Sequence, residues 1–502
     1  MFGNQKRHIS EGKNGLLTGL LLSEIKASRE RSKSTGEAQI IQADITQLLN
    51  ERSFLDPWDF ASQRDMPDDS KAFLWHDGRS GRSFYAAGVL DERTFDGEER
   101  FDLAQEFLEQ AKRRLIQLPA VINNPKGSPP FMVGGFGFSS NLSKDGVWRN
   151  WPNGWMVVPK VIAYRCDNET RVVCNMYVEP NSPDSSTSDQ LNEIMEILAV
   201  SNSAHATTSL KCGPPSAIEQ PNDWKTRVEE AQKQISAGYF DKVVPARSVV
   251  MPIESNKWDH NNSIETLISL KGRHPTAVTF GVINGELGSF LGSSPEFLVC
   301  ANDGLVTAEA VAGTRRRDMD NDLDKVLSDE LLSNPKERAE HDMVVQFIKS
   351  QMEAVGVKPQ VASVPSIRQL SHIQHLHTPM FGTIPNGTSV LKLAESLHPT
   401  PAVAGLPRRA ALKHISDTED MDRGWYSGPI GWLHEDGDGE FIVGLRSALV
   451  RDNEIHAFAG AGVVEGSDFA AEWRETSLKL SAICDVIFGS DTQEDLVNVG
   501  EK

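Results

Sequence analysis

Two stretches in the second half of the chain each carry two glutamates three residues apart. They are Glu337 and Glu340 in PKERAEHDMV, and Glu472 and Glu475 in AAEWRETSLKL. Residues three apart lie on one face of a helix, so each stretch would present two carboxylates together. Two such helices brought side by side would offer only oxygen ligands, the donor set that Mg²⁺ prefers. The spacing therefore predicts a magnesium site.

Glutamate-rich helix faces are more often simply solvated, so the surroundings of each pair matter. Apolar residues typical of burial follow both pairs, namely Met343, Val344, Phe347 and Ile348, and then Leu478, Ile483 and Val486. Ser467 or Asp468 is a predicted N-cap, which would place the second pair in the first turns of its helix, where the helix dipole keeps carboxylates ionised. Lys479 lies one turn beyond Glu475, and a lysine beside a metal ion suits a substrate that carries carboxylates.

Three further charged residues interrupt apolar, strand-like runs in the same half of the chain. They are Lys242 in FDKVVPARSVV, Glu296 in FLGSSPEFLV and Arg446 in FIVGLRSALV. Each alone is typical of an edge charge that discourages aggregation, but three together favour a functional site. Burial would lower the pKa of Lys242 and raise that of Glu296, as a base and an acid acting near neutral pH require.

Composition limits the classes of partner. The formal net charge of −19 excludes nucleic acid and anionic membranes as general partners, because both are bound by basic surfaces. The longest apolar run near the start, residues 15–22, is too short to span a membrane. The five cysteines are an odd number without CxxC spacing, which argues against a disulfide framework or a zinc site and favours a reducing cytoplasm.

The first half of the chain is predicted to be rich in strands. Residues 1–36 form a basic arm, in which Glu11, Glu24 and Glu30 argue against an organelle-targeting peptide. Residues 37–180 are predicted to contain a helix over 101–116, a hairpin over 73–85 and strands flanking Gly134 and Gly135. Residues 181–222, rich in Pro, Ser and Asn, are predicted to be a surface linker with a short helix near 191–200.

The second half, residues 223–490, is predicted to be the catalytic core, followed by a tail over 491–502. It opens with a helix over 223–237 that ends at Gly238, and a strand over 240–251. Tight turns follow at 284–285, 302–304 and 436–439. Strands joined by tight turns are antiparallel, and the helices occur in blocks, so the predicted class is α+β with large antiparallel sheets and helices outside them.

The chain resembles the chorismate-utilising enzymes, and among them the isochorismate synthases, in a series of motifs. In order, these are KVVPAR, GSSPEFL, EAVAGTRRR, KERAEHDMV, HLHT, SLHPTPAVAGLP, DRGWYSGPIGW, GLRSALV and FAGAGVVEGSDFAAEWRETSLKL. They cover residues 224–488, and VGGFGFSSN and WMVVPKVIAYR resemble the family's N-terminal half. The resemblance implies the fold of anthranilate synthase component I, with antiparallel sheets packed as a sandwich.

The resemblance also implies roles for the acidic residues and for Lys242. Glu340 and Glu475 match the family's Mg²⁺ ligands, and Glu337 and Glu472 match carboxylates that act on the metal directly or through water. The metal would hold the ring carboxylate of chorismate. Lys242 matches the lysine that activates water for attack at C2 of chorismate.

A second group of positions matches the acid and the substrate contacts. Glu296 matches the acid that protonates the departing C4 hydroxyl, and no redox cofactor is implied. The remaining matches, which are implied substrate contacts, are Gly313, Thr314, His375, Thr378, Ala402, Arg446, Gly460 and Lys479.

Two positions separate the relatives. Enzymes of the family that add ammonia generally lack the lysine at the place of Lys242, so water is the expected nucleophile. Salicylate synthases keep the lysine but tend to carry threonine at the place of Ala402, so isochorismate formation is favoured, with salicylate formation as the alternative. A catalytically silent chorismate-binding protein is disfavoured because the acid, the base and the metal glutamates are all present.

Two expectations concern the strand around Lys242 and the assembly. Pro245 stands where the family usually has an aliphatic residue, and proline removes a strand hydrogen bond, so a bulge or an edge is predicted there. A monomer is expected, because no exposed coiled coil is evident. The downstream pathway, whether to menaquinone, a siderophore or salicylate, stays open.

Overall fold

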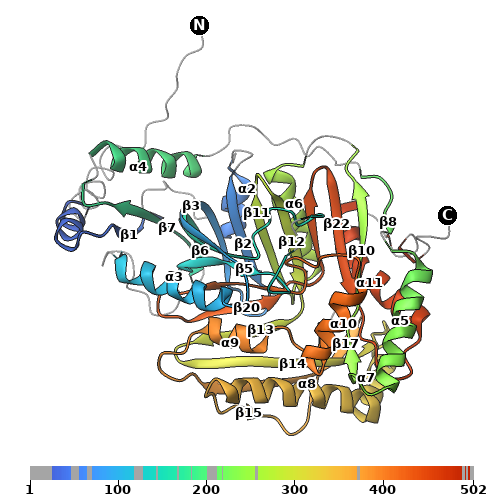
Figure 1. Ribbon diagram of the computed structural model, residues 1–502. Helices are drawn as coiled ribbons and strands as arrows, with labels where there is room; N and C mark the ends of the chain where they lie inside the picture. The colour runs from blue at the N-terminus through green and yellow to red at the C-terminus, as the bar shows by residue number, and fades with distance from the viewer. Residues whose placement is uncertain are drawn as a thin grey trace.

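The protein is described by a computed structural model that covers residues 25–46, 56–64, 70–117, 128–142, 145–166, 169–181, 184–199, 212–217, 219–254, 258–369, 373–488, 492 and 496–497. Its strands join into one large, mostly antiparallel sheet with helices on the outside (Figure 1), so the predicted α+β class is confirmed. The sheet has two branches.

The first branch combines strands from both halves of the sequence. In order of pairing, it contains β4 (Leu115–Gln117), β1 (Gln39–Asp44), β7 (Glu169–Val178), β6 (Gly154–Cys166), β3 (Ser83–Phe95), β2 (Lys71–Asp77), β11 (Val278–Asn284), β12 (Gly288–Ser294), β21 (Ser447–Arg451), β22 (Glu454–Gly460), β10 (Ala246–Pro252) and β8 (Ser216–Ala217). The β1–β4 pair is parallel and the others are antiparallel.

The second branch starts from β6. It contains β5 (Met132–Phe136), β19 (Pro429–Leu433), β20 (Gly439–Val443), β13 (Phe297–Asn302), β14 (Leu305–Arg316) and β17 (Ile373–Thr383), with β15 (Gln360–Val361) and β16 (Ser366–Gln369) both paired to β17. A separate two-stranded ribbon joins β9 (Lys242–Val243) to β18 (Gly405–Leu406).

The branch point is strand β6. One edge of β6 pairs with β3 along most of its length. On its other edge, residues 154–157 pair with β5 and residues 161–166 pair with β7. One long strand therefore belongs to both branches, which then fold over each other.

Alternation along the strands produces two apolar layers. Between the branches, Phe73, Trp75 and Phe84 stack on one another, and Phe84 meets Trp432 of the second branch edge-on with ring centroids 6.4 Å apart. On the outer face of the first branch, Tyr85 contacts Phe60 of helix α2 (Pro57–Ser62). The packing is therefore a sandwich, as the family resemblance implied.

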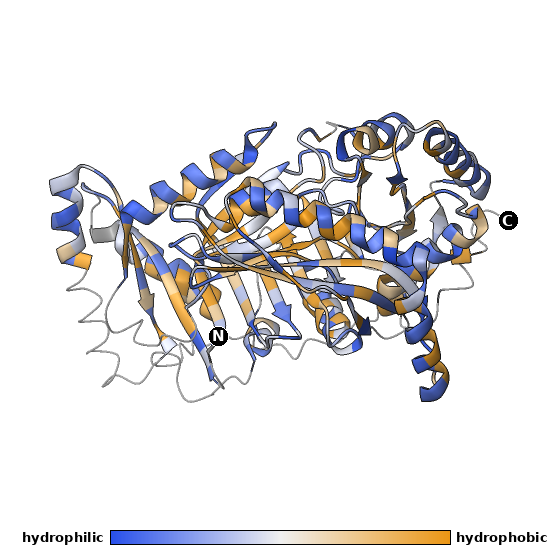
Figure 2. Ribbon diagram, turned by 90° about the horizontal axis from the view of Figure 1, so that it is seen from below, coloured by the Kyte–Doolittle hydropathy of each residue, from blue (hydrophilic) through white to orange (hydrophobic). Residues whose placement is uncertain are grey.

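Helices cover both outer faces (Figure 2), with hydrophilic sides turned outward and apolar strands between. On the first branch these are α2, α6 (His260–Arg273) and α11 (Phe469–Phe488), the last flanked by α5 (Pro221–Ser236). On the second branch they are α7 (Asn321–Ser333), α8 (Pro335–Ala354) and α9 (Val390–Leu397), and α3 (Arg100–Arg114) packs on β1, β3 and β6 and against α9. Two further helices are α4 (Asp184–Leu198) and α10 (Arg408–Thr418).

Most predicted local elements are confirmed. The helices over 101–116 and 223–237 are α3 and α5, and Gly238 has a positive φ of 76° at the end of α5. The three hairpin turns join β11 to β12, β13 to β14, and β19 to β20. The linker helix is α4, although it starts earlier than predicted, and residues 200–211 lie outside the described residues.

Two strand predictions need correction. Gly134 and Gly135 lie inside β5 rather than between two strands, because a Cβ on Gly134 would fall 1.9 Å from the Trp155 carbonyl oxygen of the neighbouring β6. The strand over 240–251 is divided into β9 and β10 at Val244 and Pro245, a break in the strand where a bulge or an edge was predicted.

The chain ends are only partly described. Residues 25–35 of the predicted arm are helical, and residues 1–24 lie outside the described residues. In the tail, Leu496 is buried, and the Val497 carbonyl accepts a hydrogen bond from Trp473 Nε1 at 3.0 Å. Among the described residues, no helix has the length and apolar character needed to cross a membrane.

Candidate active site

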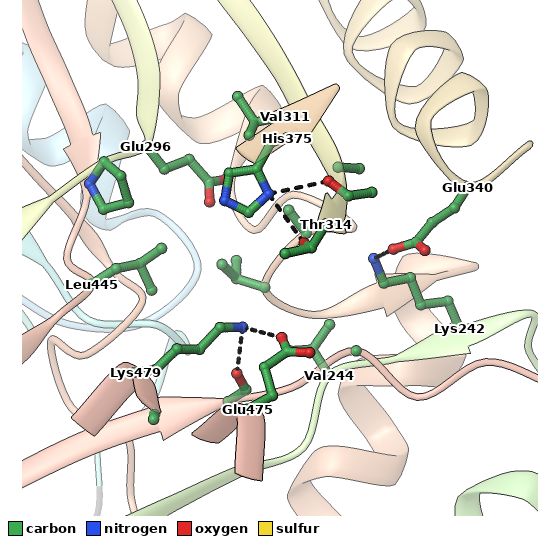
Figure 3. A pocket seen from close by; sticks show the side chains of 18 of the residues that line it. Lys242, Val244, Glu296, Val311, Thr314, Glu340, His375, Leu445, Glu475 and Lys479 are labelled. Atoms are coloured by element: carbon green, nitrogen blue, oxygen red, sulfur yellow. Dashed lines mark hydrogen bonds and ion pairs between the residues drawn. The ribbon is translucent and has the colours of Figure 1, made fainter. Parts of the chain in front are cut away.

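A cavity of about 250 Å³ opens where the ends of β9, β14 and β22 meet the starts of α8 and α11 (Figure 3). It gathers segments that are far apart in the sequence. The predicted site residues that line it are Lys242, Glu296, Gly313, Thr314, Glu337, Glu340, His375, Ala402, Arg446, Gly460, Glu472, Glu475 and Lys479. Only Thr378 of the predicted set lies elsewhere.

Lys242 is held by backbone hydrogen bonds on both sides of it. The Asp241 N–H donates to the Leu406 carbonyl at 2.7 Å, and the Val243 N–H donates to the Val463 carbonyl at 3.1 Å. The Lys242 side chain is only 6% exposed, and its Nζ lies 2.6 Å from Glu340 Oε1. The strand break at Pro245 therefore leaves the lysine in the cavity.

Glu296 approaches the cavity from the turn after β12. Its backbone N–H donates to Ser294 Oγ at 3.2 Å, and Thr400 Oγ1 donates to Glu296 Oε1 at 3.4 Å. Burial raises the pKa of Glu296 to about 7, although the positive charge of Lys242 opposes that change. The direction of this shift is the one predicted from the sequence, and a carboxyl with a pKa of about 7 still carries its proton in about half of the molecules at pH 7. Figure 3 shows Glu296 and Lys242 on opposite sides of the site.

Two cations line another wall of the cavity. Lys479 Nζ pairs with Glu475 Oε1 at 2.6 Å and donates to the Gly460 carbonyl at 3.0 Å. Arg446 follows β20 with a φ of 49°, an unusual backbone conformation for a residue with a side chain. Within the described part of the chain, no carboxylate lies within ion-pairing distance of its guanidinium. Arg446 is therefore available to an anion.

A bulge at Gly313 shapes the adjacent wall. Gly313, with a φ of 74°, interrupts the register between β14 and β17. The Thr314 N–H donates a hydrogen bond to Glu337 Oε2 at 3.1 Å. Thr314 Oγ1 and the Gly313 carbonyl each lie 3.1 Å from His375 Nδ1. Burial lowers the pKa of His375 to about 4, so the imidazole is neutral at pH 7.

The four glutamates come from the first turns of α8 and α11. Asn334 caps α8, and Asp468 Oδ1 accepts a hydrogen bond from the Ala471 N–H at 2.8 Å at the start of α11. The expectation that the helix dipole keeps Glu472 ionised is wrong, because burial and the nearby charge of Glu475 raise its pKa to about 7. Lys242 and Lys479 compensate part of the negative charge crowded into this cavity, and a further cation would stabilise the carboxylates more.

The donor set fits a magnesium ion. Within the described ranges, no three acidic, histidine or cysteine side chains converge closely enough to hold a metal by themselves. Glu340 forms an ion pair with Lys242, and Glu475 forms one with Lys479. Mg²⁺, however, is usually bound by one or two protein carboxylates with water and substrate oxygens completing the shell. The oxygen ligands of Glu340 and Glu475 in one cavity meet that requirement.

Thr378 is not a cavity residue. Its side chain is 2% exposed, and its Oγ1 lies 2.8 Å from Nε2 of His341 on α8. Neighbouring side chains of a strand point to opposite faces, so a residue three positions after His375 in β17 points away from the cavity. The HLHT motif therefore contributes its first histidine and not its threonine.

The cavity also contains residues that the sequence did not single out. Arg368 from β16 and Tyr426 line it, together with Lys336, Leu445 and Phe458. Tyr426 falls inside the DRGWYSGPIGW motif, which marked the region but not the residue. Arg368 has no such signal, because its partner Glu309 is 59 positions away.

The cavity of this α+β sandwich places the carboxylic acid of Glu296 opposite Lys242, and the guanidinium of Arg446 lines the same cavity. These features are those of an enzyme that acts on a small anionic molecule. A family model described as "Chorismate binding enzyme" matches residues 30–488, and the chain therefore belongs to the chorismate-binding enzymes.

Several characterised proteins are similar over most of the chain. The salicylate biosynthesis isochorismate synthase of Pseudomonas aeruginosa is 30% identical over 453 residues, which cover 90% of this chain and 92% of that protein. The isochorismate synthase MenF of Bacillus subtilis is 28% identical over 446 residues, which cover 87% of this chain and 92% of that protein. The solved structure of MenF, the menaquinone-specific isochorismate synthase from Escherichia coli, has a TM-score of 0.74 at 24% sequence identity. The match covers 90% of this chain and 94% of that one, so the two share the fold.

Proposed function

We propose that this enzyme is an isochorismate synthase, which converts chorismate into isochorismate. The observation that carries the proposal is the placement of Lys242 and Glu296 on opposite sides of one cavity, where burial raises the pKa of Glu296 to about 7. The similar proteins that cover most of this chain carry the same activity in their names.

The reaction moves a hydroxyl group from C4 to C2 of the ring. Lys242, acting as the general base, takes a proton from water while the water oxygen bonds to C2. The ring double bonds then shift, the C4–O bond breaks, and Glu296 protonates the leaving oxygen. One water is added and one is released, so the atoms balance without a redox cofactor.

The cations and the glutamates orient the substrate. Arg446, which has no carboxylate partner among the described residues, and Lys479 would bind the carboxylates of chorismate. Glu340 and Glu475, supported by Glu337 and Glu472, would hold Mg²⁺, which supplies positive charge at the substrate carboxylate. Like the monomeric state and the cytoplasmic location, the magnesium cofactor stays a prediction.

Ala402 bears on the choice of product. It lines the cavity with a methyl group, where the salicylate-forming relatives tend to carry a threonine hydroxyl. Its small, apolar side chain adds no further proton donor near the substrate. We therefore expect the reaction to stop at isochorismate.

The test is to incubate the purified full-length protein with chorismate and MgCl₂ and to separate the products by liquid chromatography. Isochorismate as the first product supports the proposal, and Glu296→Gln should abolish its formation. Salicylate with pyruvate from the earliest times, or unchanged chorismate, would refute it.

A further inference from the structure

The cavity contains a cation that the reaction described above does not use. Arg368 of β16 lines the cavity, and its side chain is 15% exposed. Its Nη1 lies 2.7 Å from Glu309 Oε2, and its Nη2 lies 2.9 Å from His377 Nε2. The guanidinium is therefore fixed from two directions and cannot swing freely toward solvent.

Glu309 connects this arginine to the N-terminal half of the chain. Arg79, in the turn between β2 and β3, places Nη1 at 3.3 Å from both carboxylate oxygens of Glu309. Although burial favours the neutral acid, hydrogen bonds from His377 and Arg368 and the charge of Arg79 hold the pKa of Glu309 well below its usual range. The Glu309 carboxylate therefore stays ionised and forms ion pairs with both Arg368 and Arg79.

The same turn also packs beneath the acid. The Arg79 guanidinium lies 3.2 Å from the ring centroid of Phe297, the residue that follows Glu296. Asp77 holds the turn by accepting hydrogen bonds from the Arg79 and Ser80 N–H groups at 2.9 and 3.2 Å. A hairpin of the first branch is thus built into the wall that carries Glu296.

We propose that Arg368 is a positioning residue for the isochorismate synthase reaction: anchored by Glu309 and Arg79, it holds a fixed positive charge in the cavity that Glu296 also lines, and it stabilises the carboxylate that remains after Glu296 has given its proton to the leaving oxygen. The inference rests on the proposed function. The charged groups that face Glu296 are Lys242 of β9, Lys479 of α11, Arg446 after β20 and Arg368 of β16.

Among these cations, Arg368 is distinguished by its support. Lys242 and Lys479 each have a cavity glutamate as partner, and Arg446 has none among the described residues. Arg368 alone is held by a carboxylate outside the cavity, so its charge should stay in place when the substrate and a cation occupy the glutamates. An acid is strengthened when its conjugate base is stabilised by a nearby fixed charge.

The test measures kcat, KM for chorismate and the pH profile of four full-length variants. Arg368→Gln should lower kcat by about tenfold or more and leave KM within about twofold. It should also move the pH break, meaning the inflection of the pH–rate profile that reports the pKa of Glu296, to higher pH. Arg368→Lys should keep that break close to its original position because it keeps the charge. It should recover only part of kcat, since lysine cannot bridge Glu309 and His377 as a planar guanidinium does.

Two variants in the β2–β3 region separate positioning from folding. Arg79→Gln removes one cation from Glu309 at a side chain that is 30% exposed, and it should shift kcat and the pH break in the same direction by less. Arg82→Gln removes the same charge from the start of β3, where Arg82 lies over the Trp432 ring, and should leave both unchanged.

An unchanged kcat and pH break in Arg368→Gln would overturn the inference, and so would a rise in KM alone. If Arg368→Gln does not fold, unchanged kinetics in both Arg368→Lys and Arg79→Gln would overturn it equally. Failure of the proposed function looks different, because the wild-type enzyme itself would then form no isochorismate, and the inference would fall with it.

Discussion

Lys242 is the side chain on which the proposed chemistry depends most. We expect Lys242→Ala to lower turnover by roughly 10²- to 10⁴-fold, the usual contribution of a general base, while chorismate still binds through the cations that remain. Turnover is measured by chromatography and binding by calorimetry. Lys349→Ala is the matched control, because Lys349 lies on α8 with its side chain 42% exposed. Turnover like that of the wild type in Lys242→Ala would contradict the assigned role.

Glu296 should make the folded protein sensitive to pH. Burial raises its pKa from an ordinary value of 4.5 to about 7, so the folded state loses stability as pH rises through that interval, where only the unfolded chain has released the proton. Glu296→Gln cannot ionise and should be more stable than wild type at pH 8, by roughly 1 to 3 kcal/mol. The difference in free energy of unfolding should vanish below about pH 4.5. Denaturant titrations across this range test it, and a difference that does not vary with pH would rule out the buried acid.

Single residues were predictable where they broke a local pattern. Lys242, Glu296 and Arg446 interrupt apolar strands, and each is found in the cavity. Thr378 was misplaced because a motif does not show which face of a strand a residue occupies. Arg368 was missed because its meaning depends on Glu309, which only the pairing of β16 with β17 and of β17 with β14 brings beside it.

At the scale of elements, the strand β9 and the segment after β22 hold the lysine between them. A Cβ on Gly462 would fall 3.0 Å from Lys242 Cε, so this glycine leaves room for the lysine side chain. We expect Gly462→Ala to displace the amine by a few tenths of an ångström and to lower kcat by about three- to tenfold, because rates are sensitive to such misplacement. The steady-state kinetics of the purified variant are the measurement.

The control for this change is Gly272→Ala on α6. A Cβ at Gly272 meets nothing within 4 Å, and alanine favours a helix by up to about 1 kcal/mol over glycine. Its kcat should therefore equal that of wild type, with stability equal or slightly higher. A Gly462→Ala enzyme that keeps full kcat would show that the lysine does not depend on this contact.

Local elements followed from local chemistry. Turn residues predicted the three hairpins of the second half, and Pro245, where a bulge or an edge was predicted, is the position at which the strand divides into β9 and β10. Gly134 and Gly135 were expected between two strands rather than inside one, but glycine is equally required where backbones approach closely, as β5 approaches β6. Only the tertiary partner distinguishes these two uses of glycine.

At the scale of the whole molecule, the decisive feature is the branching of the sheet at β6. The sequence indicated strands in both halves but not that β6 would pair with β3 on one edge and with both β5 and β7 on the other. Hydrogen bonds between strands do not depend on side-chain identity, so partner choice leaves little trace in one sequence. The branching folds β14 and its helix α8 over the first branch, where α11 lies, and so brings their glutamates to one cavity.

This arrangement predicts that a divalent cation links two distant parts of the molecule. Glu340 of α8 and Glu475 of α11 are separated by more than a hundred residues in the sequence. Their two negative charges come close to each other only when the protein is folded. Any cation that binds only the folded state stabilises it by mass action, by about 2.7 kcal/mol at a hundred times its Kd. We expect MgCl₂ to raise the melting temperature of the wild type and EDTA to reverse the rise. Glu340→Gln and Glu475→Gln should lose most of this response, whereas Glu353→Gln, at an exposed position of α8, should keep it. If all four proteins respond equally, or none responds, the ion does not join the two helices.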